Sequence, residues 1–494
     1  MVDVVLTHSY HLRYDAKQLR KMQPYRPLGT LYAASALRES GVSVAIFDTM
    51  LRDPEEFGSF LEQTQPRVIA IYEDDFNFVT KMCLSRMREV VWRFAEMAHE
   101  KRIPIVVHGS DASDNPELFF AQGIDYLLRG EAEGALLELC QSLLAGQPME
   151  EIAGLTQARS DRAVLRQVSN AANNPEWSHT PYPPLQLTDF ELYREAWKNA
   201  HGYFSVNMVA SRGCPFRCNW CAKPISGNKF QLRAPGEVAE EMLQLKTHAQ
   251  AEHLWFSDDV FALDRHWTME FAHEVKVRKA ALPFKVQSRA DLMTHETVSA
   301  LKDAGCAEVW MGVESGSQRV LDRMDKGLKI SSVKVARKLL KDAGIRACYF
   351  LQFGYPGEKW DDLKMTIDLV RETHPDDVGI SFSYPLPGTL FYARVQEQLG
   401  SKRNWSESDD LCILFQGEYT TEFYRAVRDA LHAEVDSWSN SSSTTLFEVQ
   451  QLWSLVEKME PSSRISAEID SSIHAGAKIA GFVSVSALSA KVGA

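Results

Sequence analysis

The sequence has few cysteines, no excess of positive charge and no long apolar run. Only eight cysteines are spread over 494 residues, unlike the dense disulfide framework of a small secreted domain, so reduced thiols are expected. Lys and Arg number 54 against 66 Asp and Glu, and the net charge of −12 argues against a nucleic-acid surface. The run IAGFVSVSALSA is shorter than the roughly 20 residues of a membrane-spanning helix. With no signal-peptide core at the N-terminus, we expect a soluble, cytoplasmic protein without a transmembrane segment.

The first 146 residues alternate short apolar runs with helical patterns. Strands are predicted in VVLTH, SVAIFD, VIAIY, IPIVVHG and DYLLRG, and the longest helix in FVTKMCLSRMREVVWRFAEMAHEK. This alternation predicts an α/β domain with a doubly wound parallel sheet. Such sheets bind ligands at the carboxyl ends of their strands, here in the loops after Thr7, Asp48, Tyr72 and His108. No G-x-G-x-x-G follows the first strand, so a dinucleotide is not expected.

The rest of the chain is expected to form three further regions. Residues 147–200 predict a connector, because NNPEWSHTPYPPLQLTDF is rich in Pro and Asn; GLTQARSDRAVLRQ suits a small hairpin. In 201–400, strands are predicted in YFSVNMVAS, HLWFSDD, FKVQSRA, EVWMGVES, CYFLQFG and VGISFSYP. Six such units predict a partial, TIM-like (β/α)6 barrel with its chemistry on the loops after the strands. Residues 401–494 are expected to be helical, with SWSNSSSTT as a loop.

Three cysteines stand on the loop after the first barrel strand. ASRGCPFRCNWCAKP places Cys214, Cys218 and Cys221 at spacings of four and three, with no fourth cysteine or histidine nearby. Three thiolates can hold three irons of a [4Fe-4S] cluster and leave the fourth iron open, whereas an electron-carrying cluster normally has four cysteine ligands. A structural zinc site is the alternative, but it needs four ligands, and only the distant Cys306 or Cys348 would be left to complete it.

The C-x-x-x-C-x-aromatic-C pattern of this loop resembles the signature of the radical S-adenosylmethionine (SAM) enzymes. In that family the open iron binds the amino and carboxylate groups of SAM, and reductive cleavage yields a 5′-deoxyadenosyl radical that takes hydrogen from an unactivated carbon. The resemblance continues in FSDDVF, QSRADL, GVESGS, GYPGE and YPLPGT, after the second to sixth barrel strands. It implies SAM contacts from Trp220, Asp258, Asp259, Ser288, Arg289, Glu314 and Ser315.

Several of these residues would also suit simpler roles. Asp258 or Asp259 would suit the N-cap of the helix that follows, and Ser315 or Ser317 the N-cap of the helix expected near Gln318. Packing alone would explain the indole of the loop tryptophan, because the family uses the backbone of that residue beside adenine.

The N-terminal region resembles the Rossmann-like cobalamin-binding domain that precedes the radical domain in the cobalamin-dependent branch. The resemblance rests on YRPLGTLYAASALRESGVSVAIFD, DYLLRGEAEGALLEL and the bridge PYPPLQLTDFELY. No D-x-H-x-x-G occurs in the first 150 residues, so a histidine ligand to cobalt is not expected, although His8, His11 and His108 stand on the loops. The cobalamin contacts implied by the resemblance are Thr7, His8, Pro27, Leu28, Gly29, Asp48, Tyr72, His108, Gly109, Gly130 and Glu131.

The resemblance implies an enzyme that uses a [4Fe-4S] cluster, SAM and cobalamin on a small molecule, with an electron donor such as flavodoxin or ferredoxin. Its branch includes methylases of unactivated carbons and the anaerobic Mg-protoporphyrin monomethyl ester cyclase. Methylation is favoured on family frequency, and cyclisation, oxidation or rearrangement without methyl transfer is the alternative. A non-catalytic iron-sulfur carrier or zinc-stabilised binding protein is a third class. A tRNA methylthiotransferase is disfavoured, because its N-terminal domain should hold three further cluster cysteines and this one has only Cys83 and Cys140.

Overall fold

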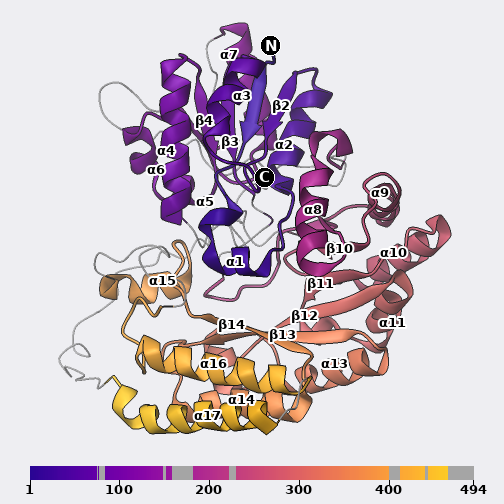
Figure 1. The fold of residues 1–494 in the computed structure, drawn as a ribbon, viewed down its shortest axis with the longest axis vertical. Coiled ribbons are helices and arrows are strands. Elements are labelled where there is room, and N and C mark those ends of the chain that lie inside the picture. Colours follow the sequence, from indigo (N-terminus) through magenta and orange to yellow (C-terminus); the bar gives the residue numbers. More distant parts are fainter. Residues whose placement is uncertain are drawn as a thin grey trace, which may run out of the picture.

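The computed structural model describes residues 1–74, 76, 84–147, 152–157, 182–221, 230–399, 412–439 and 443–465. Three sequence features lie outside these residues: Cys83, the part of the expected hairpin GLTQARSDRAVLRQ that follows Gln157, and the run IAGFVSVSALSA. The chain forms an N-terminal sheet flanked by helices, a barrel-like second sheet and a pair of C-terminal helices (Figure 1). None of the helices among the described residues is long and apolar enough to span a membrane.

The N-terminal sheet has the strand order β2-β1-β3-β4-β5-β6. All five predicted strands are present and parallel, while a sixth strand, from the segment expected to be a connector, is added antiparallel to β5. The chain order reverses at β1, between β2 and β3, and in sheets of this kind ligands bind beside that switch point. The strands are β1 (Val4–Thr7), β2 (Val44–Phe47), β3 (Val68–Tyr72), β4 (Ile105–His108), β5 (Tyr126–Leu128) and β6 (Leu155–Gln157).

Helices cover both faces of this sheet, which confirms the doubly wound fold. β3 is buried along its whole length, because its apolar side chains alternate between two cores. One core contains side chains of α2 (Leu28–Glu39) and α7 (Glu133–Ala145), and the other those of α3 (Glu56–Thr64), α4 (Leu84–Glu100) and α6 (Pro116–Ala121). Helix α7 is not predicted from the sequence, because the helical period is hidden in its apolar run ALLELCQSLLA. The short helices α1 (Ala16–Lys21) and α5 (Ser110–Asp114) are not predicted either.

One helix of the connecting segment, α8 (Phe190–His201), lies where the N-terminal domain meets the barrel (Figure 1). Its buried side chains are Tyr193 and Trp197. Trp197 Nε1 donates to the carbonyl of Pro24 at 2.8 Å. At the same interface the side-chain amide of Asn207 in the barrel exchanges hydrogen bonds with the backbone of Arg26, each 2.8 Å long. The two domains therefore share a buried, hydrogen-bonded interface.

The second sheet is the predicted partial barrel. Its six strands are all parallel and follow one another in chain order, with β7 and β14 at the two edges. The strands are β7 (Ser205–Met208), β10 (His253–Phe256), β11 (Phe284–Ser288), β12 (Cys306–Glu314), β13 (Arg346–Phe353) and β14 (Asp377–Phe382). The helices between them are α9 (Pro235–Thr247), α10 (Arg265–Arg278), α11 (His295–Ala304), α12 (Gln318–Arg323), α13 (Ile330–Asp342) and α14 (Trp360–Thr373), and α15 (Leu390–Val395) follows β14.

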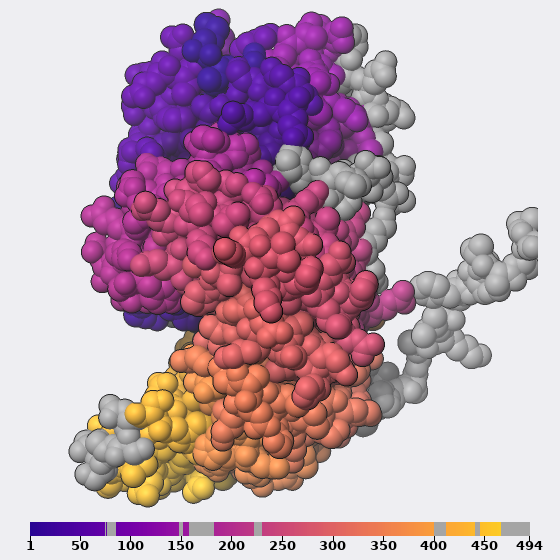
Figure 2. All heavy atoms as spheres, turned by 90° about the vertical axis from the view of Figure 1, so that its right-hand side faces the viewer, coloured from indigo at the N-terminus to yellow at the C-terminus, as the bar shows by residue number. Residues whose placement is uncertain are grey.

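In its described part, the C-terminal region that is expected to be helical contains α16 (Thr421–Ser437) and α17 (Ser443–Ser463). α16 begins at the N-cap Thr420, whose hydroxyl accepts from the amide of Phe423. The apolar face of α16 packs into the barrel core beside β14. Figure 2 shows the N-terminal domain at one end of the molecule, and these helices beside the last part of the barrel domain at the other end.

Candidate functional site

The cysteine loop starts from a short hairpin at the carboxyl end of the first barrel strand. Strands β8 (Ser211–Arg212) and β9 (Gln231–Leu232) pair antiparallel and close the base of the loop. Gly213 follows β8 with a φ of 85°, a left-handed conformation that glycine adopts without strain. Of the three ligand candidates, Cys214 is buried, and Cys218 and Cys221 are half-buried. The cysteine loop therefore lies where the sequence predicts it, at the carboxyl end of the barrel strands.

One residue between the cysteines fixes this loop to three other barrel loops. Asn219, which is 3% exposed, donates from Nδ2 to the carbonyl of Arg323 at 2.8 Å and to Asp325 Oδ2 at 2.7 Å. The hydroxyl of Tyr355, in the loop after β13, donates to Asn219 Oδ1 at 2.8 Å. The backbone amide and carbonyl of Asn219 bond to Met324 and Phe391. With its side-chain and backbone groups all engaged, Asn219 anchors the loop.

Replacing Asn219 by alanine is expected to loosen the cluster loop, because its three side-chain hydrogen bonds to Arg323, Asp325 and Tyr355 are lost, at roughly 1 kcal/mol for each. After anaerobic reconstitution, iron should pass to a chelator several-fold faster than from the wild-type protein. Asn115→Ala is the matched control, since Asn115 donates to Asp111 within the N-terminal domain. An unchanged rate of iron release from Asn219→Ala would contradict the anchoring role.

Two buried cations lie beside the cysteine thiols. The guanidinium of Arg289 lies 3.7 Å from the ring centroid of Phe216, inside the cysteine loop, and is held by Asp291. Burial raises the pKa of Cys218, and the charges of Lys326 and Arg289 counteract that rise. Burial likewise raises the pKa of Cys214. Thiols in such surroundings stay protonated until a metal displaces the proton, while the cations favour the anionic, metal-bound form.

Lys326 forms a buried ion pair with Glu314. The Lys326 Nζ atom lies 2.8 Å from Glu314 Oε1, and both side chains are 7% exposed. Glu314 ends β12 with a φ of 63°, a strained conformation for a residue other than glycine. A Cβ at Gly312 would lie 2.8 Å from both charged atoms, so a side chain at this position would displace the pair. Strain and buried charge together are typical of a functional site.

The donor set fits a cluster better than a single metal ion. In the part of the chain that the structure describes, no three Cys, His, Asp or Glu side chains are grouped as a metal ion would require. Thiolates that bind separate irons need not converge on one point. Cys306 is the first residue of β12 and Cys348 the third of β13, whereas the cysteine loop follows the carboxyl end of β7. Neither of these distant cysteines therefore completes a zinc site.

The other residues implied for SAM differ in how deeply their side chains are buried. The buried carboxylate of Asp258 accepts from the Ser211 hydroxyl and the Ala210 amide, and burial raises its pKa to about 7. The hydroxyls of Ser288 and Ser315 bond to Phe261 and Thr366. In contrast, Asp259 is half-buried, and its charge acts on Cys214. Of the two aspartates, Asp259 is the better placed for a ligand.

The capping alternatives are wrong for these side chains. The N-cap of α10 is Asp264, not Asp258 or Asp259. Ser317 stands at the N-cap of α12 but makes no side-chain cap bond; its hydroxyl donates to Asp362 at 2.6 Å. Packing does account for the indole of Trp220, which contacts the apolar cluster of Tyr355 and Phe391.

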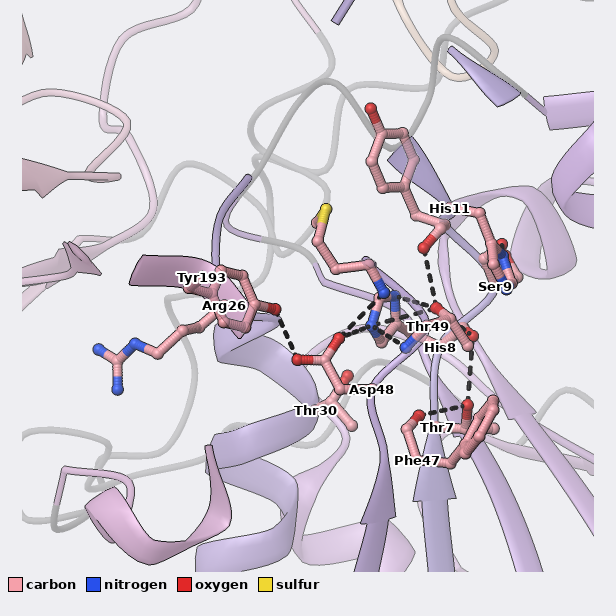
Figure 3. Close-up of polar contacts among 12 residues, drawn as sticks. Thr7, His8, Ser9, His11, Arg26, Thr30, Phe47, Asp48, Thr49 and Tyr193 are labelled. Atoms are coloured by element: carbon pink, nitrogen blue, oxygen red, sulfur yellow. Dashed lines mark hydrogen bonds and ion pairs between the residues drawn. The ribbon is translucent and has the colours of Figure 1, made fainter. Parts of the chain in front are cut away.

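In the N-terminal domain, a polar network joins the loops after β1 and β2 to α8 (Figure 3). Asp48 Oδ1 lies 3.0 Å from His8 Nε2, and the hydroxyl of Tyr193 donates to Asp48 Oδ2 at 2.5 Å. The hydroxyl of Thr49 lies 3.0 Å from His8 Nδ1. Burial alone would raise the pKa of Asp48, but the hydrogen bonds from His8 and Tyr193 lower it below its usual range. His8 and Asp48 therefore hold the domain to α8.

The three loop histidines are each 1–2% exposed. His8 is enclosed by this network, and His108 Nε2 lies 2.8 Å from the carbonyl of Gly130. His11 Nδ1 lies 3.1 Å from the carbonyl of Ser9, and burial lowers the pKa of His11 to about 4. Their burial supports the prediction that no histidine of this chain binds cobalt, which stays a prediction.

A second network links the loops after β3, β4 and β5. The rings of Tyr72 and His108 stack with centroids 3.9 Å apart, and the hydroxyl of Tyr72 accepts from the amide of Ala132 at 3.3 Å. Of the residues implied for cobalamin, Asp48, Gly130 and Glu131 are half-buried and the others buried. The buried set comprises Thr7, His8, Pro27, Leu28, Gly29, Tyr72, His108 and Gly109.

Sequence reasoning missed Asn219, Lys326 and Tyr193. Asn219 occupies the unspecified position of the cysteine motif, and Lys326 lies twelve residues beyond its partner Glu314. Tyr193 is 145 residues from its partner Asp48. Lys326, the first lysine of MDKGLK, offered a weak signal, because it follows a predicted barrel loop. Asn219 and Tyr193 carried no signal in the sequence.

Comparison with known proteins supports both resemblances, to the radical SAM enzymes and to the cobalamin-binding domain. Residues 208–370 match the model of the radical SAM superfamily, and residues 23–140 match that of the B12 binding domain. An uncharacterized methyltransferase of Pyrococcus horikoshii is 24% identical over 389 residues, 77% of this chain and 80% of the relative. The anaerobic magnesium-protoporphyrin IX monomethyl ester cyclase of Rubrivivax gelatinosus is 24% identical over 390 residues, 76% of this chain and 66% of the relative.

A solved structure shows the same fold. It is that of TsrM from Kitasatospora setae, a radical S-adenosylmethionine methyltransferase with cobalamin and a [4Fe-4S] cluster bound. The TM-score is 0.65 at 19% identity, covering 82% of this chain and 76% of TsrM. The chain therefore carries a radical SAM domain preceded by a B12-binding domain.

Proposed function

We propose that this protein methylates an unactivated carbon of a small molecule, using a [4Fe-4S] cluster, SAM and cobalamin. The observation that carries the proposal is the meeting of the two domains at the cysteine loop. Arg212, two residues before Cys214, forms a 2.6 Å ion pair with Glu133 of the N-terminal domain. Because both folds bind ligands at the carboxyl ends of their strands, cobalamin and SAM would face one another there.

The residues of the chain bind, orient and enclose the reactants. Cys214, Cys218 and Cys221 would hold the cluster, and Arg289 with the Glu314–Lys326 pair would fix the charged and polar groups of SAM. The bound cofactors supply the one-electron cleavage of SAM and the transfer of the methyl group. The chain contributes positioning of the substrate carbon and exclusion of water.

The assignment of regions belongs to the same proposal. Residues 1–146 would bind cobalamin through the loops after β1 to β5, residues 147–200 would connect the domains, and residues 201–400 would form the radical SAM barrel. Residues 401–494 would form the helical C-terminal region. The described cysteines are all free thiols, which suits a cytoplasmic setting. A flavodoxin or ferredoxin would supply the electron, and no nucleic-acid partner is proposed.

Ring closure or oxidation without methyl transfer is the second candidate. It is favoured by the similarity to the Rubrivivax gelatinosus cyclase, which is 24% identical, as the Pyrococcus horikoshii methyltransferase is. The two candidates differ in the fate of the SAM methyl group, so an isotope separates them.

The test is anaerobic incubation of the reconstituted protein with cobalamin, a reductant, a metabolite extract and SAM labelled with deuterium in its methyl group. Methylation predicts a product carrying the labelled methyl, formed together with S-adenosylhomocysteine and 5′-deoxyadenosine. Cyclisation or oxidation predicts 5′-deoxyadenosine with a product of unchanged carbon count and no stoichiometric S-adenosylhomocysteine. The second pattern would contradict the methylation proposal.

A further inference from the structure

The side chain of Arg212 links the base of the cysteine loop to the N-terminal domain. Arg212 is the last residue of β8, and its backbone is paired with Gln231 in the barrel domain. Its guanidinium contacts the N-terminal domain. Nη2 donates to Glu133 Oε1 at 2.6 Å, and Nη1 lies 4.0 Å from Glu131 Oε2. It also lies 4.8 Å from the ring centroid of Phe76, in the loop after β3.

This ion pair is shielded from water and strongly charged. The side chains of Arg212 and Glu133 are 11% and 4% exposed. Burial alone would raise the pKa of Glu133, but the charge of Arg212 and its hydrogen bond lower it below the usual range. Glu133 is also the first residue of α7, where the helix dipole favours a negative charge. The pair therefore persists over the whole neutral range of pH.

On the N-terminal side, the pair continues into the residues implied for cobalamin. Glu131 and Glu133 flank Ala132, whose amide donates to the hydroxyl of Tyr72. Tyr72 stacks on His108, and His108 Nε2 lies 2.8 Å from the carbonyl of Gly130. A ligand that moves these rings or this loop must also move the partners of Arg212.

On the barrel side, the residues before Arg212 are held rigidly. The carboxylate of Asp258 accepts from the amide of Ala210 at 3.0 Å and also from the hydroxyl of Ser211. Cys214 follows two residues after Arg212. Because Ala210 and Ser211 are fixed, a displacement of the Arg212 guanidinium would move the chain on the other side of Arg212. That side contains Cys214, the first cluster ligand.

From this continuous chain of contacts we propose that Arg212 is a positioning residue that couples cobalamin binding to the state of the cluster. The inference rests on the proposed function, since it takes the two cofactor sites as given. A cluster that orders the cysteine loop fixes Arg212, and Arg212 then holds Glu131 and Glu133 in the position that receives cobalamin. Coupling of this kind is reciprocal, so each cofactor strengthens the binding of the other by the same factor.

The experiment measures the dissociation constant of hydroxocobalamin for cluster-loaded and chelator-stripped protein, by equilibrium dialysis under anaerobic conditions. For the wild type we expect tighter binding to the loaded form. The ratio of the dissociation constant of the stripped form to that of the loaded form should be about five or more. Arg212→Gln and Glu133→Gln should each bring this ratio close to one, and Arg212→Lys should restore part of it. The double variant Arg212→Met/Glu133→Leu should also give a ratio near one while keeping the fold, because a buried ion pair can be replaced by apolar side chains at little cost.

Arg337→Gln is the matched control. It removes another buried cation, which bonds to His374 and Asp376 near the amino end of β14, and it should leave the ratio at the wild-type value. A wild-type ratio of one, or an undiminished ratio in Arg212→Gln, would overturn the coupling. Equal binding of cobalamin to both forms would contradict this inference alone, whereas failure of both forms to bind cobalamin would contradict the proposed function as well.

Discussion

Alanine at any one of Cys214, Cys218 and Cys221 is expected to abolish the [4Fe-4S] cluster and all formation of 5′-deoxyadenosine. Three thiolates are the minimum that holds such a cluster with one iron open, and the described part of the site contains no further grouping of cysteine, histidine or carboxylate ligands. Iron and acid-labile sulfide content, the absorbance of the cluster and chromatography of the nucleoside product measure the two losses.

Cysteines elsewhere in the chain serve as matched controls. Cys140 is fully buried in the core of the N-terminal domain, and Cys412 lies beside the hydroxyl of Thr421 at the start of α16. Alanine at either position should leave cluster content and product formation largely intact. Full cluster content in Cys218→Ala would refute the assignment.

The second large effect is expected at Lys326. Lys326→Met leaves the carboxylate of Glu314 buried without its partner, and removing one member of a buried ion pair typically costs about 3–5 kcal/mol. Loss of the charge beside Cys218 should also misplace SAM, with a fall in 5′-deoxyadenosine formation on the order of 100-fold. The unfolding transition of the barrel domain and the initial rate of nucleoside release report the two effects.

A double variant separates stability from function. Lys326→Met/Glu314→Gln removes both charges, so most of the lost stability should return, while SAM cleavage should stay low. If the double variant cleaves SAM at the wild-type rate, the pair is only structural. An unaltered stability of Lys326→Met would contradict the buried pairing itself.

Local patterns in the sequence predict most of the fold. The strands of both sheets were found because buried parallel strands are short apolar runs separated by helical segments, as in VIAIY of β3. The segment of β6 was expected in a local hairpin and not in this sheet, since three residues, LTQ, carry too little pattern to predict their pairing with β5. The cysteine loop was found because spacing alone defines it.

The sequence predicts the candidate site less completely, because its contacts are tertiary. Ser288 and Ser315 stand in family-like loops, yet their hydroxyls are used inside the protein. The partners Arg212 and Glu133 are 79 residues apart, and no periodicity links them. Glu314 was identified from its loop, but its left-handed backbone and its ion pair with Lys326, twelve residues further along the chain, are not visible in the sequence.

Mössbauer spectroscopy of protein reconstituted with iron-57 shows whether the three cysteines hold a cluster whose fourth iron is open to SAM. We expect one cluster of four irons per chain and, on addition of SAM, a changed signal from a single iron site while the other three irons keep theirs. A spectrum that SAM leaves unchanged, or a protein that takes up zinc in place of iron, would contradict it.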